Sequence, residues 1–174
     1  TTQGAERRIT AASLQLSAPQ PGDLVCVSGF SLLGRTRDPL LEWLDTLAEG
    51  VIVVLDPGAA FAGLERSVRE RVLARTDVWT GNADEARDLT GLAPIAESVL
   101  AVGGLLREGA VAIVRDGPAG CVIAEAGRVQ VVPGYPQQPI DTNGAGDTHT
   151  GVLCACRVAG LSWEESARRA NAAG

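Results

Sequence analysis

Residues 141–147 read DTNGAGD and lead into an apolar stretch, GVLCACRV, at residues 151–158. Glycines stand on both sides of Ala145, and a residue without a Cβ lets backbone N–H groups approach a ligand closely. The apolar stretch predicts a helix that begins at this loop, and the first turn of a helix adds unpaired N–H groups and the positive end of the helix dipole. The loop is therefore a predicted binding site for phosphate.

Asp147 closes the loop, where a carboxylate could take a proton from a hydroxyl that attacks the bound phosphate. An anion site beside a base is the minimum that phosphoryl transfer requires. A plainer alternative is that residues 144–146 form only a tight turn and that Asp147 is a first-turn carboxylate suited to the helix dipole. Short glycine motifs are weak signals alone, so the rest of the chain must decide between the two.

Composition limits the classes of function. The chain has 174 residues, of which 45% are hydrophobic and 21% charged, as in a globular domain with its own core. Its formal net charge of −6 argues against nucleic acid or an anionic membrane as a partner. No apolar run approaches the ~18 residues of a membrane span, and no signal peptide is visible. We expect one domain over residues 1–174, located in the cytoplasm.

The thiols and the lone histidine make no convincing metal site. The four cysteines are Cys26, Cys121, Cys154 and Cys156. Their spacing suggests neither a disulfide framework nor, with His149, a zinc set, so we interpret them as buried thiols in a reducing compartment. His149 follows the loop by two residues. We favour a neutral histidine on the helix surface, and a position lining the site is the alternative.

Apolar runs alternate with helical patterns along the chain. We expect strands at residues 24–28, 51–55, 77–80 and 111–115, a β-hairpin at 121–132 and helices at 38–50, 62–75, 94–108 and 145–160, with a last helix after Ser162. Asp38 is the predicted N-cap of the first helix. Strands and helices that alternate with short connections predict an α/β fold with a doubly wound, mostly parallel sheet and flanking helices.

Three polar or small residues follow predicted strands directly. Asp56, Asn82 and Gly117 each lie just beyond an apolar run, and ligands of such sheets bind at the carboxyl ends of the strands. Glu85 lies three residues after Asn82, where a carboxylate could hold Mg²⁺ through water. The alternative for this pair is a capping box at a helix start. Gly120 lies three residues after Gly117, which allows close approach of a nucleotide, although a plain turn is the alternative.

The order of these motifs resembles the ribokinase-like family of carbohydrate kinases, of the phosphofructokinase-B type. The motifs are DP at 56–57, NADE at 82–85, GPAG at 117–120 and DTNGAGD at 141–147, and the resemblance runs from about Val25 to Gly174. It implies that Asp147 is the general base that activates a sugar hydroxyl. It also implies that Gly144, Ala145 and Gly146, with the Asp147 N–H, form the anion hole for the transferred phosphoryl group.

The resemblance implies the other ligand contacts as well. Asn82 and Glu85 would organise Mg²⁺ and the phosphates of ATP, with the metal held by Glu85 through water. Gly117 and Gly120 would lie near the nucleotide, and Asn171 would lie near the adenine. Asp141 and Asn143 match positions that bind a monovalent cation, usually K⁺, in many members.

The chain also departs from the family pattern. The family's N-terminal half is absent, including the first strands and most of the β-sheet lid, and GAERR at residues 4–8 resembles the tail of that lid. Residues 1–22 are therefore interpreted as the end of a lid region. Many members carry an arginine shortly after DP, whereas GAAF follows here at residues 58–61. Any homodimer is expected to form through regions outside this chain.

These observations favour an ATP-dependent sugar kinase that transfers the γ-phosphoryl group of Mg-ATP to a sugar hydroxyl. A nucleoside kinase of the same family is the nearest alternative. Hydroxymethylpyrimidine and pyridoxal kinases form a second, although they often replace the last Asp of the loop, which is present here as Asp147. A non-catalytic nucleotide-binding regulator is a third alternative, from a different functional class.

Overall fold

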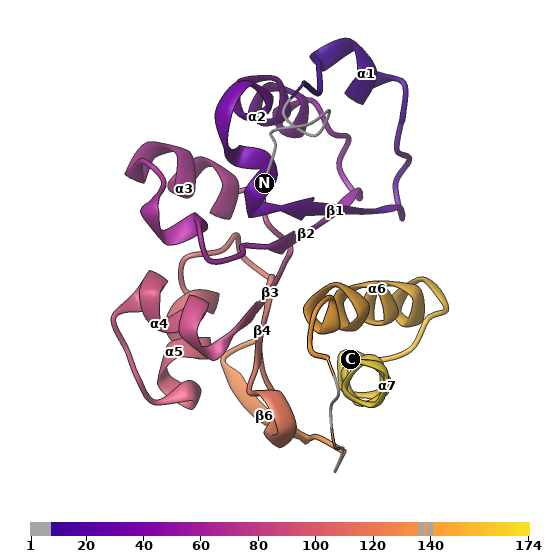
Figure 1. The fold of residues 1–174 in the computed structure, drawn as a ribbon. Helices are drawn as coiled ribbons and strands as arrows, with labels where there is room; N and C mark the ends of the chain where they lie inside the picture. The colour runs from indigo at the N-terminus through magenta and orange to yellow at the C-terminus, as the bar shows by residue number, and fades with distance from the viewer. Residues whose placement is uncertain (1–7, 136–137, 139–140) are drawn as a thin grey trace.

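A six-stranded sheet forms the centre of the molecule, and helices cover both of its faces (Figure 1). The computed structural model describes residues 8–135, 138 and 141–174. The strands follow chain order across the sheet: β1 (Leu24–Ser28), β2 (Ile52–Asp56), β3 (Val78–Asn82), β4 (Val111–Arg115), β5 (Gly120–Glu125) and β6 (Arg128–Pro133). Residues 4–7 of the predicted lid remnant lie outside the described residues.

The sheet is mixed, with a parallel part and an antiparallel part. β1 to β4 pair in parallel, β5 pairs antiparallel with β4, and β6 pairs antiparallel with β5. Ala126 and Gly127 join β5 to β6, and both have positive φ, 49° and 73°. Two adjacent residues with positive φ form a tight turn, and the twist of this turn matches the twist of the two strands that it joins. The mostly parallel sheet and the hairpin around Gly127 are both confirmed.

The helices form a layer on each side of the sheet. They are α1 (Ala11–Gln15), α2 (Arg37–Asp45), α3 (Arg66–Leu73), α4 (Ala83–Thr90), α5 (Ile95–Gly103), α6 (Ala145–Val158) and α7 (Trp163–Ala173). Helices α2 to α5 lie on one face, and α6 and α7 on the other (Figure 1). Alternate strand residues point to the two faces, so Val53 and Leu55 join one core cluster and Val54 joins the other.

Several local expectations were wrong at the ends of elements. Thr36, not Asp38, is the N-cap of α2; Asp38 lies in the first turn, where its carboxylate accepts a hydrogen bond from Arg37 at 2.8 Å. Strand β3 continues to Asn82, beyond the predicted end at residue 80, because Asn82 is in register with Arg115 of β4. Among the described residues, no helix is both long and apolar enough to cross a membrane.

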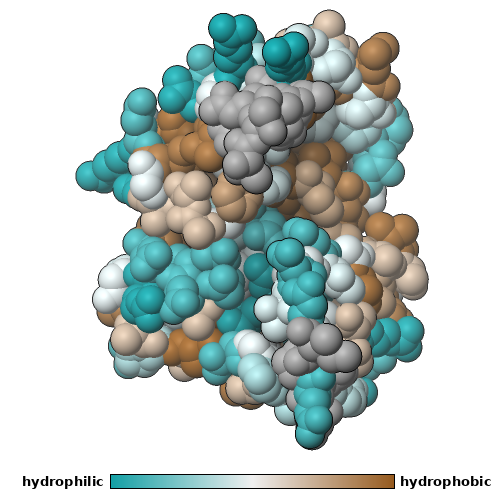
Figure 2. Space-filling model, viewed as in Figure 1, coloured by the Kyte–Doolittle hydropathy of each residue, from teal (hydrophilic) through white to brown (hydrophobic). Residues whose placement is uncertain are grey.

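The prediction that all four cysteines are buried is also wrong. Cys121 is buried in β5, whereas Cys26 is exposed, and Cys154 and Cys156 are partly exposed. Cys26 lies on β1, an edge strand of the sheet, which pairs with one strand only, β2, among the described residues. Figure 2 shows hydrophobic residues gathered in the upper half of the view and a polar patch near α4 below them.

Candidate active site

Three polar side chains end three adjacent parallel strands. Asp56, Asn82 and Arg115 are the last residues of β2, β3 and β4. Parallel strands bring their carboxyl ends to one edge of the sheet, as expected for Asp56 and Asn82. Arg115 was not proposed as a site residue, although a charged residue at the end of the otherwise apolar run VAIVR was a visible signal.

Asn82 and Glu85 form the capping box that the spacing allowed. The Asn82 side-chain oxygen accepts the Glu85 N–H at 2.8 Å, and Glu85 Oε2 accepts the Asn82 N–H at 2.8 Å. Gly81 leaves room for the Trp79 ring and for Glu85, because a Cβ there would lie 2.3 Å from the ring and 2.9 Å from Glu85 Oε2. Burial raises the pKa of the Glu85 carboxyl, and its hydrogen bond with the Asn82 backbone opposes that effect. The pair is therefore held at the start of α4.

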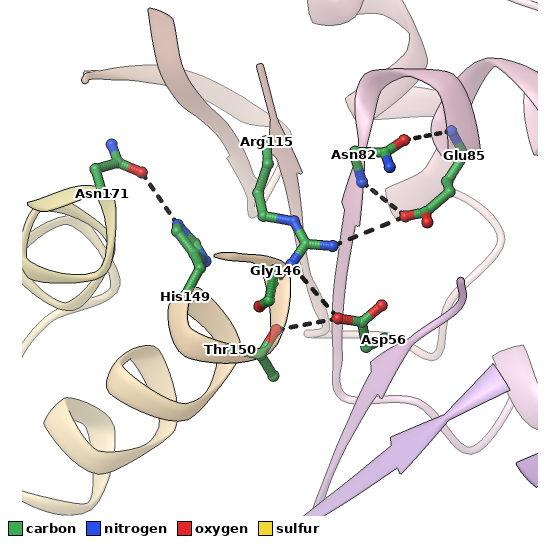
Figure 3. A network of polar contacts seen from close by, with 8 residues as sticks. All are labelled: Asp56, Asn82, Glu85, Arg115, Gly146, His149, Thr150 and Asn171. Atoms are coloured by element: carbon green, nitrogen blue, oxygen red, sulfur yellow. Dashed lines mark hydrogen bonds and ion pairs between the residues drawn. The ribbon is translucent and has the colours of Figure 1, made fainter. Parts of the chain in front are cut away.

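Arg115 connects the strand ends to the loop before α6 (Figure 3). Its Nη1 lies 3.4 Å from Asp56 Oδ2 and donates to the Gly146 carbonyl at 2.8 Å. Its Nη2 lies 3.8 Å from Glu85 Oε2, and Thr150 donates to Asp56 Oδ2 at 3.2 Å. The four side chains of Asp56, Glu85, Arg115 and Thr150 are called the strand-end cluster below. The ionic groups of this cluster are 11% to 21% exposed, so solvent screens them only weakly.

The glycine-rich loop caps α6 by its backbone geometry. Gly144 is the N-cap residue with φ of 79°, in the left-handed region that glycine tolerates without strain. The Ala145 N–H donates to the Thr142 carbonyl at 3.2 Å, so it is already engaged. Within the described part of the chain, the N–H groups of Gly146 and Asp147 have no backbone acceptor. These two groups point out of the helix start and are available to an anion.

A pocket of about 430 Å³ lies between the loop, α7 and the ends of β3 and β4. Its lining residues are Asn82, Arg115, Gly117, Pro118, Gly120, Gly134, Tyr135, Asp141, Thr142, Ala145, Gly146, His149, Asn171 and Gly174. Seven predicted site residues are therefore brought together here. Four others, Glu85, Asn143, Gly144 and Asp147, are not part of the lining.

Glycine is needed at the pocket wall for different structural reasons at different positions. Gly120 has φ of 100°, and a Cβ there would lie 2.2 Å from the Val132 carbonyl oxygen. A Cβ at Gly134 would lie 2.3 Å from the Pro118 oxygen. Gly120 therefore allows two backbone segments to meet at the pocket wall. Gly117 has φ of 53° with open space around it, so its backbone borders the pocket without such a neighbour.

His149 lies inside the molecule, which corrects the expectation of a surface histidine. It is 5% exposed, and its Nε2 lies 3.0 Å from Asn171 Oδ1 (Figure 3). The Asn171 amide nitrogen donates to the Val132 and Pro133 carbonyls, each at 3.1 Å. Because both carbonyls are acceptors, Asn171 Oδ1 must face His149, and His149 must carry its proton on Nε2.

The environment of His149 keeps the ring neutral. Burial, followed by the nearby Arg115 charge, lowers the pKa of His149 to about 4. With the proton on Nε2, the Nδ1 atom is an acceptor, and it is buried with no partner among the described residues. The helix pattern missed His149 because its burial depends on α7, which packs against α6 and supplies Asn171.

Asp147 lies on the other side of α6 from His149. The two residues are two positions apart on the helix, so their side chains point to different sides. Asp147 is exposed, whereas His149 lines the pocket. Ala145 and Gly146 line the pocket, whereas the neighbouring Asp147 is not part of its lining. This arrangement suits transfer of a group from a ligand in the pocket to an acceptor beside Asp147.

The oxygen donors suit a hydrated cation rather than a closed metal cage. In the ranges that the structure describes, no three His, Cys, Asp or Glu side chains are grouped so as to hold a metal ion. Glu85 provides a carboxylate, which fits Mg²⁺ because this ion keeps several waters and needs only one or two protein carboxylates. Asp141 Oδ1 accepts the Asn143 N–H at 2.8 Å, which leaves the other Asp141 oxygen as a donor for a cation.

Known proteins share this fold and parts of the sequence. The uncharacterized sugar kinase YegV of Escherichia coli (strain K12) is 27% identical over 154 residues, which cover 87% of this chain and 48% of the relative. A fructokinase from Vibrio cholerae O395, solved with fructose, ADP and calcium, has a TM-score of 0.74 and 24% identity over 88% of this chain and 52% of its own.

A second solved structure has a similar fold. Aminoimidazole riboside kinase from Salmonella enterica, complexed with aminoimidazole riboside and an ATP analogue, has a TM-score of 0.77 and 20% identity over 93% of this chain and 57% of its own. The chain spans less than half the length of the curated relatives it matches. The sequence pattern of the pfkB family of carbohydrate kinases matches residues 2–174, and the chain belongs to that family.

Proposed function

We propose that this chain is the phosphoryl-transfer part of an ATP-dependent sugar kinase, with Asp147 as the general base. The observation that carries the proposal is the position of the loop at residues 144–146. Ala145 and Gly146 of this loop line a pocket of nucleotide size, and the next residue, Asp147, presents an exposed carboxylate outside that lining. In-line transfer needs the donor and the activated hydroxyl on opposite sides of the phosphoryl group.

The pocket is proposed to bind ATP. Gly117 and Gly120 allow the nucleotide to approach the backbone, and Asn171 lies at the far wall beside His149. Membership of the pfkB family supports this assignment. So do two structural neighbours, one of which was solved with ADP and the other with an ATP analogue. The Asn171 side chain is held by His149 and by the Val132 and Pro133 carbonyls, so it gives the pocket wall a fixed shape beside the proposed position of the base.

The start of α6 is proposed to stabilise the charge on the transferred group. The free N–H groups of Gly146 and Asp147, with that of Gly144, form the anion hole. Ala145 contributes less directly, because its N–H donates to Thr142. Arg115 holds the Gly146 carbonyl at 2.8 Å and adds a fixed positive charge behind the loop. Such preorganised donors stabilise the transition state without reorganising during the reaction.

Cations complete the proposed site. Glu85 would hold Mg²⁺ through water, with Asn82 beside the phosphates, and the second Asp141 oxygen with Asn143 would hold a monovalent cation such as K⁺. When bound, Mg²⁺ would supply positive charge that offsets the negative charge developing on the phosphates during transfer. Because the Asn82 N–H occupies one Glu85 oxygen at 2.8 Å, the carboxylate is held in a fixed orientation.

The acceptor is proposed to be a sugar hydroxyl. Asp147 takes its proton as the hydroxyl oxygen attacks the γ-phosphorus, and ADP leaves with the former bridging oxygen. The fructokinase neighbour, solved with fructose, supports a free sugar. The neighbour solved with aminoimidazole riboside keeps a nucleoside as the second candidate.

ADP release by the full-length protein, with Mg-ATP and a panel of sugars and nucleosides, tests the proposal. One acceptor should stimulate release, and Asp147→Asn should lower kcat by about 10²-fold or more, because it removes the general base. Asp88→Asn is the matched control, since Asp88 is an exposed carboxylate on α4. It should leave the rate unchanged.

Two outcomes would contradict the proposal in different ways. If the panel includes no acceptor that stimulates ADP release although Mg-ATP binds, the nucleotide-binding regulator becomes the better assignment. If an acceptor stimulates release but Asp147→Asn and Asp88→Asn have equal rates, the protein is a kinase and Asp147 is not its base.

A further inference from the structure

Two thiols meet outside the pocket, where β1 and α6 pack together. The Sγ atoms of Cys26 and Cys154 lie 3.5 Å apart, although the residues are 128 positions apart in the sequence. Cys26 is the central residue of β1, and Cys154 lies in the second half of α6. Neither residue lines the pocket or contacts the strand-end cluster by a hydrogen bond, so the proposed kinase function does not use this pair.

The packing of α6 on the sheet explains why the thiols meet. Thr150 and Cys154 are four residues apart and therefore share one face of α6. Thr150 bonds Asp56 at the end of β2, and Cys154 reaches Cys26 on the neighbouring strand β1. Ser28 is in register with Asp56, two residues after Cys26. One face of the helix thus contacts both strands, and the thiol pair is part of that interface.

Cys26 is the more exposed member of the pair. Its hydrogen bond with Cys154 lowers the pKa of Cys26 to about 7, against the opposing effects of burial and of the Asp56 charge. The same hydrogen bond raises the pKa of Cys154. Because the thiolate is the nucleophilic form of cysteine, Cys26 reacts first with an electrophile. In the part of the molecule that the structure describes, a small oxidant can reach the exposed Cys26.

The other two cysteines lack this combination. Cys121 is buried in β5, and burial raises the pKa of its thiol to about 11. Cys156 lies two residues after Cys154 on α6, so it points to a different side of the helix and away from β1. The chain therefore contains its own internal controls for thiol reactivity.

We propose that Cys26 and Cys154 form a dithiol modification site, which a hydroperoxide oxidises to a disulfide that links β1 to α6. A disulfide needs a sulfur separation of about 2.05 Å, so the two sulfurs must approach by roughly 1.5 Å from their present positions. The two sulfur atoms are already in contact at this point.

The reaction has two steps. The Cys26 thiolate attacks one oxygen of H₂O₂, the O–O bond breaks, and Cys26 becomes a sulfenic acid as hydroxide leaves and is protonated to water. Cys154 then attacks the Cys26 sulfur, the S–O bond breaks and a second water leaves. In total, two thiols lose two protons and two electrons, and H₂O₂ is reduced to two waters. An added dithiol reverses the modification by exchange.

Peptide mapping of the full-length protein after treatment with H₂O₂ tests the proposal. The reduced protein is oxidised at neutral pH, alkylated, digested and analysed without reduction. A linked peptide pair that contains Cys26 and Cys154, two hydrogens lighter than the separate peptides, is expected, and a dithiol should remove it. Cys156→Ser makes the assignment unambiguous, because it leaves Cys154 as the sole cysteine of its segment of α6, and it should retain the link.

Two single variants separate the steps. Cys26→Ser should slow the peroxide-dependent loss of the Cys154 thiol at least tenfold, because the thiolate is removed. Cys154→Ser should leave Cys26 as a sulfenic acid that dimedone traps. If the unsubstituted protein yields no Cys26–Cys154 link, or if Cys26→Ser does not slow the oxidation of Cys154, the proposal is wrong. Neither result depends on kinase activity, so the two proposals can fail independently.

Discussion

The loop at residues 141–147 and the strand-end cluster lie against each other, yet their polar groups are in opposite states. In the loop, the N–H groups of Gly146 and Asp147 have no backbone acceptor among the described residues, and the Asp147 side chain is exposed. In the cluster, Arg115 contacts two carboxylates and a carbonyl. The loop is open to a ligand, whereas the cluster is satisfied within the protein.

This difference distinguishes the groups that bind the ligand from the groups that hold the site in position. Unpaired donors at a helix start gain their partner only when an anion arrives. Paired charges with little exposure contribute mainly by holding positions, because removal of one partner leaves the other charge buried. The Arg115 bond to the Gly146 carbonyl is the link between the two regions. Substitutions in the loop should therefore reduce catalysis, and substitutions in the cluster should reduce stability.

The largest effect is expected where the two regions meet, at Gly146. A Cβ there would lie 2.8 Å from Arg115 Nη1, so Gly146→Ala must displace the guanidinium or shift the loop. A misplacement of about 1 Å can cost roughly 10²-fold in rate, and kcat/KM for ATP of the full-length protein should fall by about that factor. Steady-state kinetics at saturating acceptor measure it.

Gly151→Ala is the matched control on the same helix. A Cβ at Gly151 meets no atom within 4 Å, and alanine is favoured over glycine inside a helix. This variant should keep the activity and raise the melting temperature slightly. Equal activity of the Gly146 and Gly151 variants would mean that the contact between Arg115 and the loop does not position the anion site.

The next effect is on stability, at Arg115. Arg115→Met leaves Asp56 and Glu85 without their cation, and the unfolding free energy should fall by about 2 to 3 kcal/mol, near the lower end for a broken buried ion pair. Arg66→Met removes an arginine that is 84% exposed from its pair with Glu70, and exposed pairs contribute about 0 to 1 kcal/mol. Urea denaturation of both variants compares them, and losses of equal size would show that the cluster does not act as a buried network.

The same comparison explains what could be predicted from the sequence. The loop and the strands depend on local patterns: β-branched runs, glycines and the spacing of Asn82 and Glu85. The cluster depends on contacts between distant residues. Arg115 bonds Gly146 across 31 residues, and Thr150 bonds Asp56 across 94. Such pairings follow only from the arrangement of the strands, so Arg115 and Thr150 were not identified as site residues.

The burial of His149 also depends on contacts between distant residues, and it was not predicted from the sequence. A histidine next to Thr148 and Thr150 is typical of a helix surface. Its burial arises from α7, whose Asn171 provides the hydrogen-bond partner. Fold class and family motifs could be predicted because they are carried by sequence-local signals. The neutral ring, its tautomer and the unpaired Nδ1 atom required the packed structure.

The pH dependence of stability tests the environment of His149. Its pKa is lowered to about 4 in the folded protein from 6.5. The stabilisation from this group is therefore complete above pH 6.5 and is lost progressively as the pH falls toward 4. Between pH 8 and pH 5, the native protein should lose about 1 to 2 kcal/mol relative to His149→Gln, which cannot titrate.

Glutamine is the suitable control at this position because its amide nitrogen can still donate to Asn171 Oδ1. Chemical denaturation of both proteins at several pH values gives the difference, in which the other titrating groups largely cancel. A difference that stays constant from pH 8 to pH 5 would mean that His149 is not held neutral by burial, and that the pocket wall is wetter than the structure indicates.

The smallest effect is expected at Glu85, a member of the strand-end cluster whose side chain is 11% exposed. Burial raises the pKa of this carboxyl, so the folded protein holds its proton more tightly than the unfolded chain does. The contribution of Glu85 to stability is therefore complete below the pKa of the unfolded chain and is lost as the pH rises through the pKa of the folded protein.

Glu85→Gln keeps an oxygen that can accept the Asn82 N–H, as glutamine does in capping boxes. The stability of the native protein relative to this variant should fall as the pH rises from 4 to 7. A relative stability that rises instead would show that Arg115 outweighs burial, and the cluster would then stabilise the ionised carboxylate more than the structure implies.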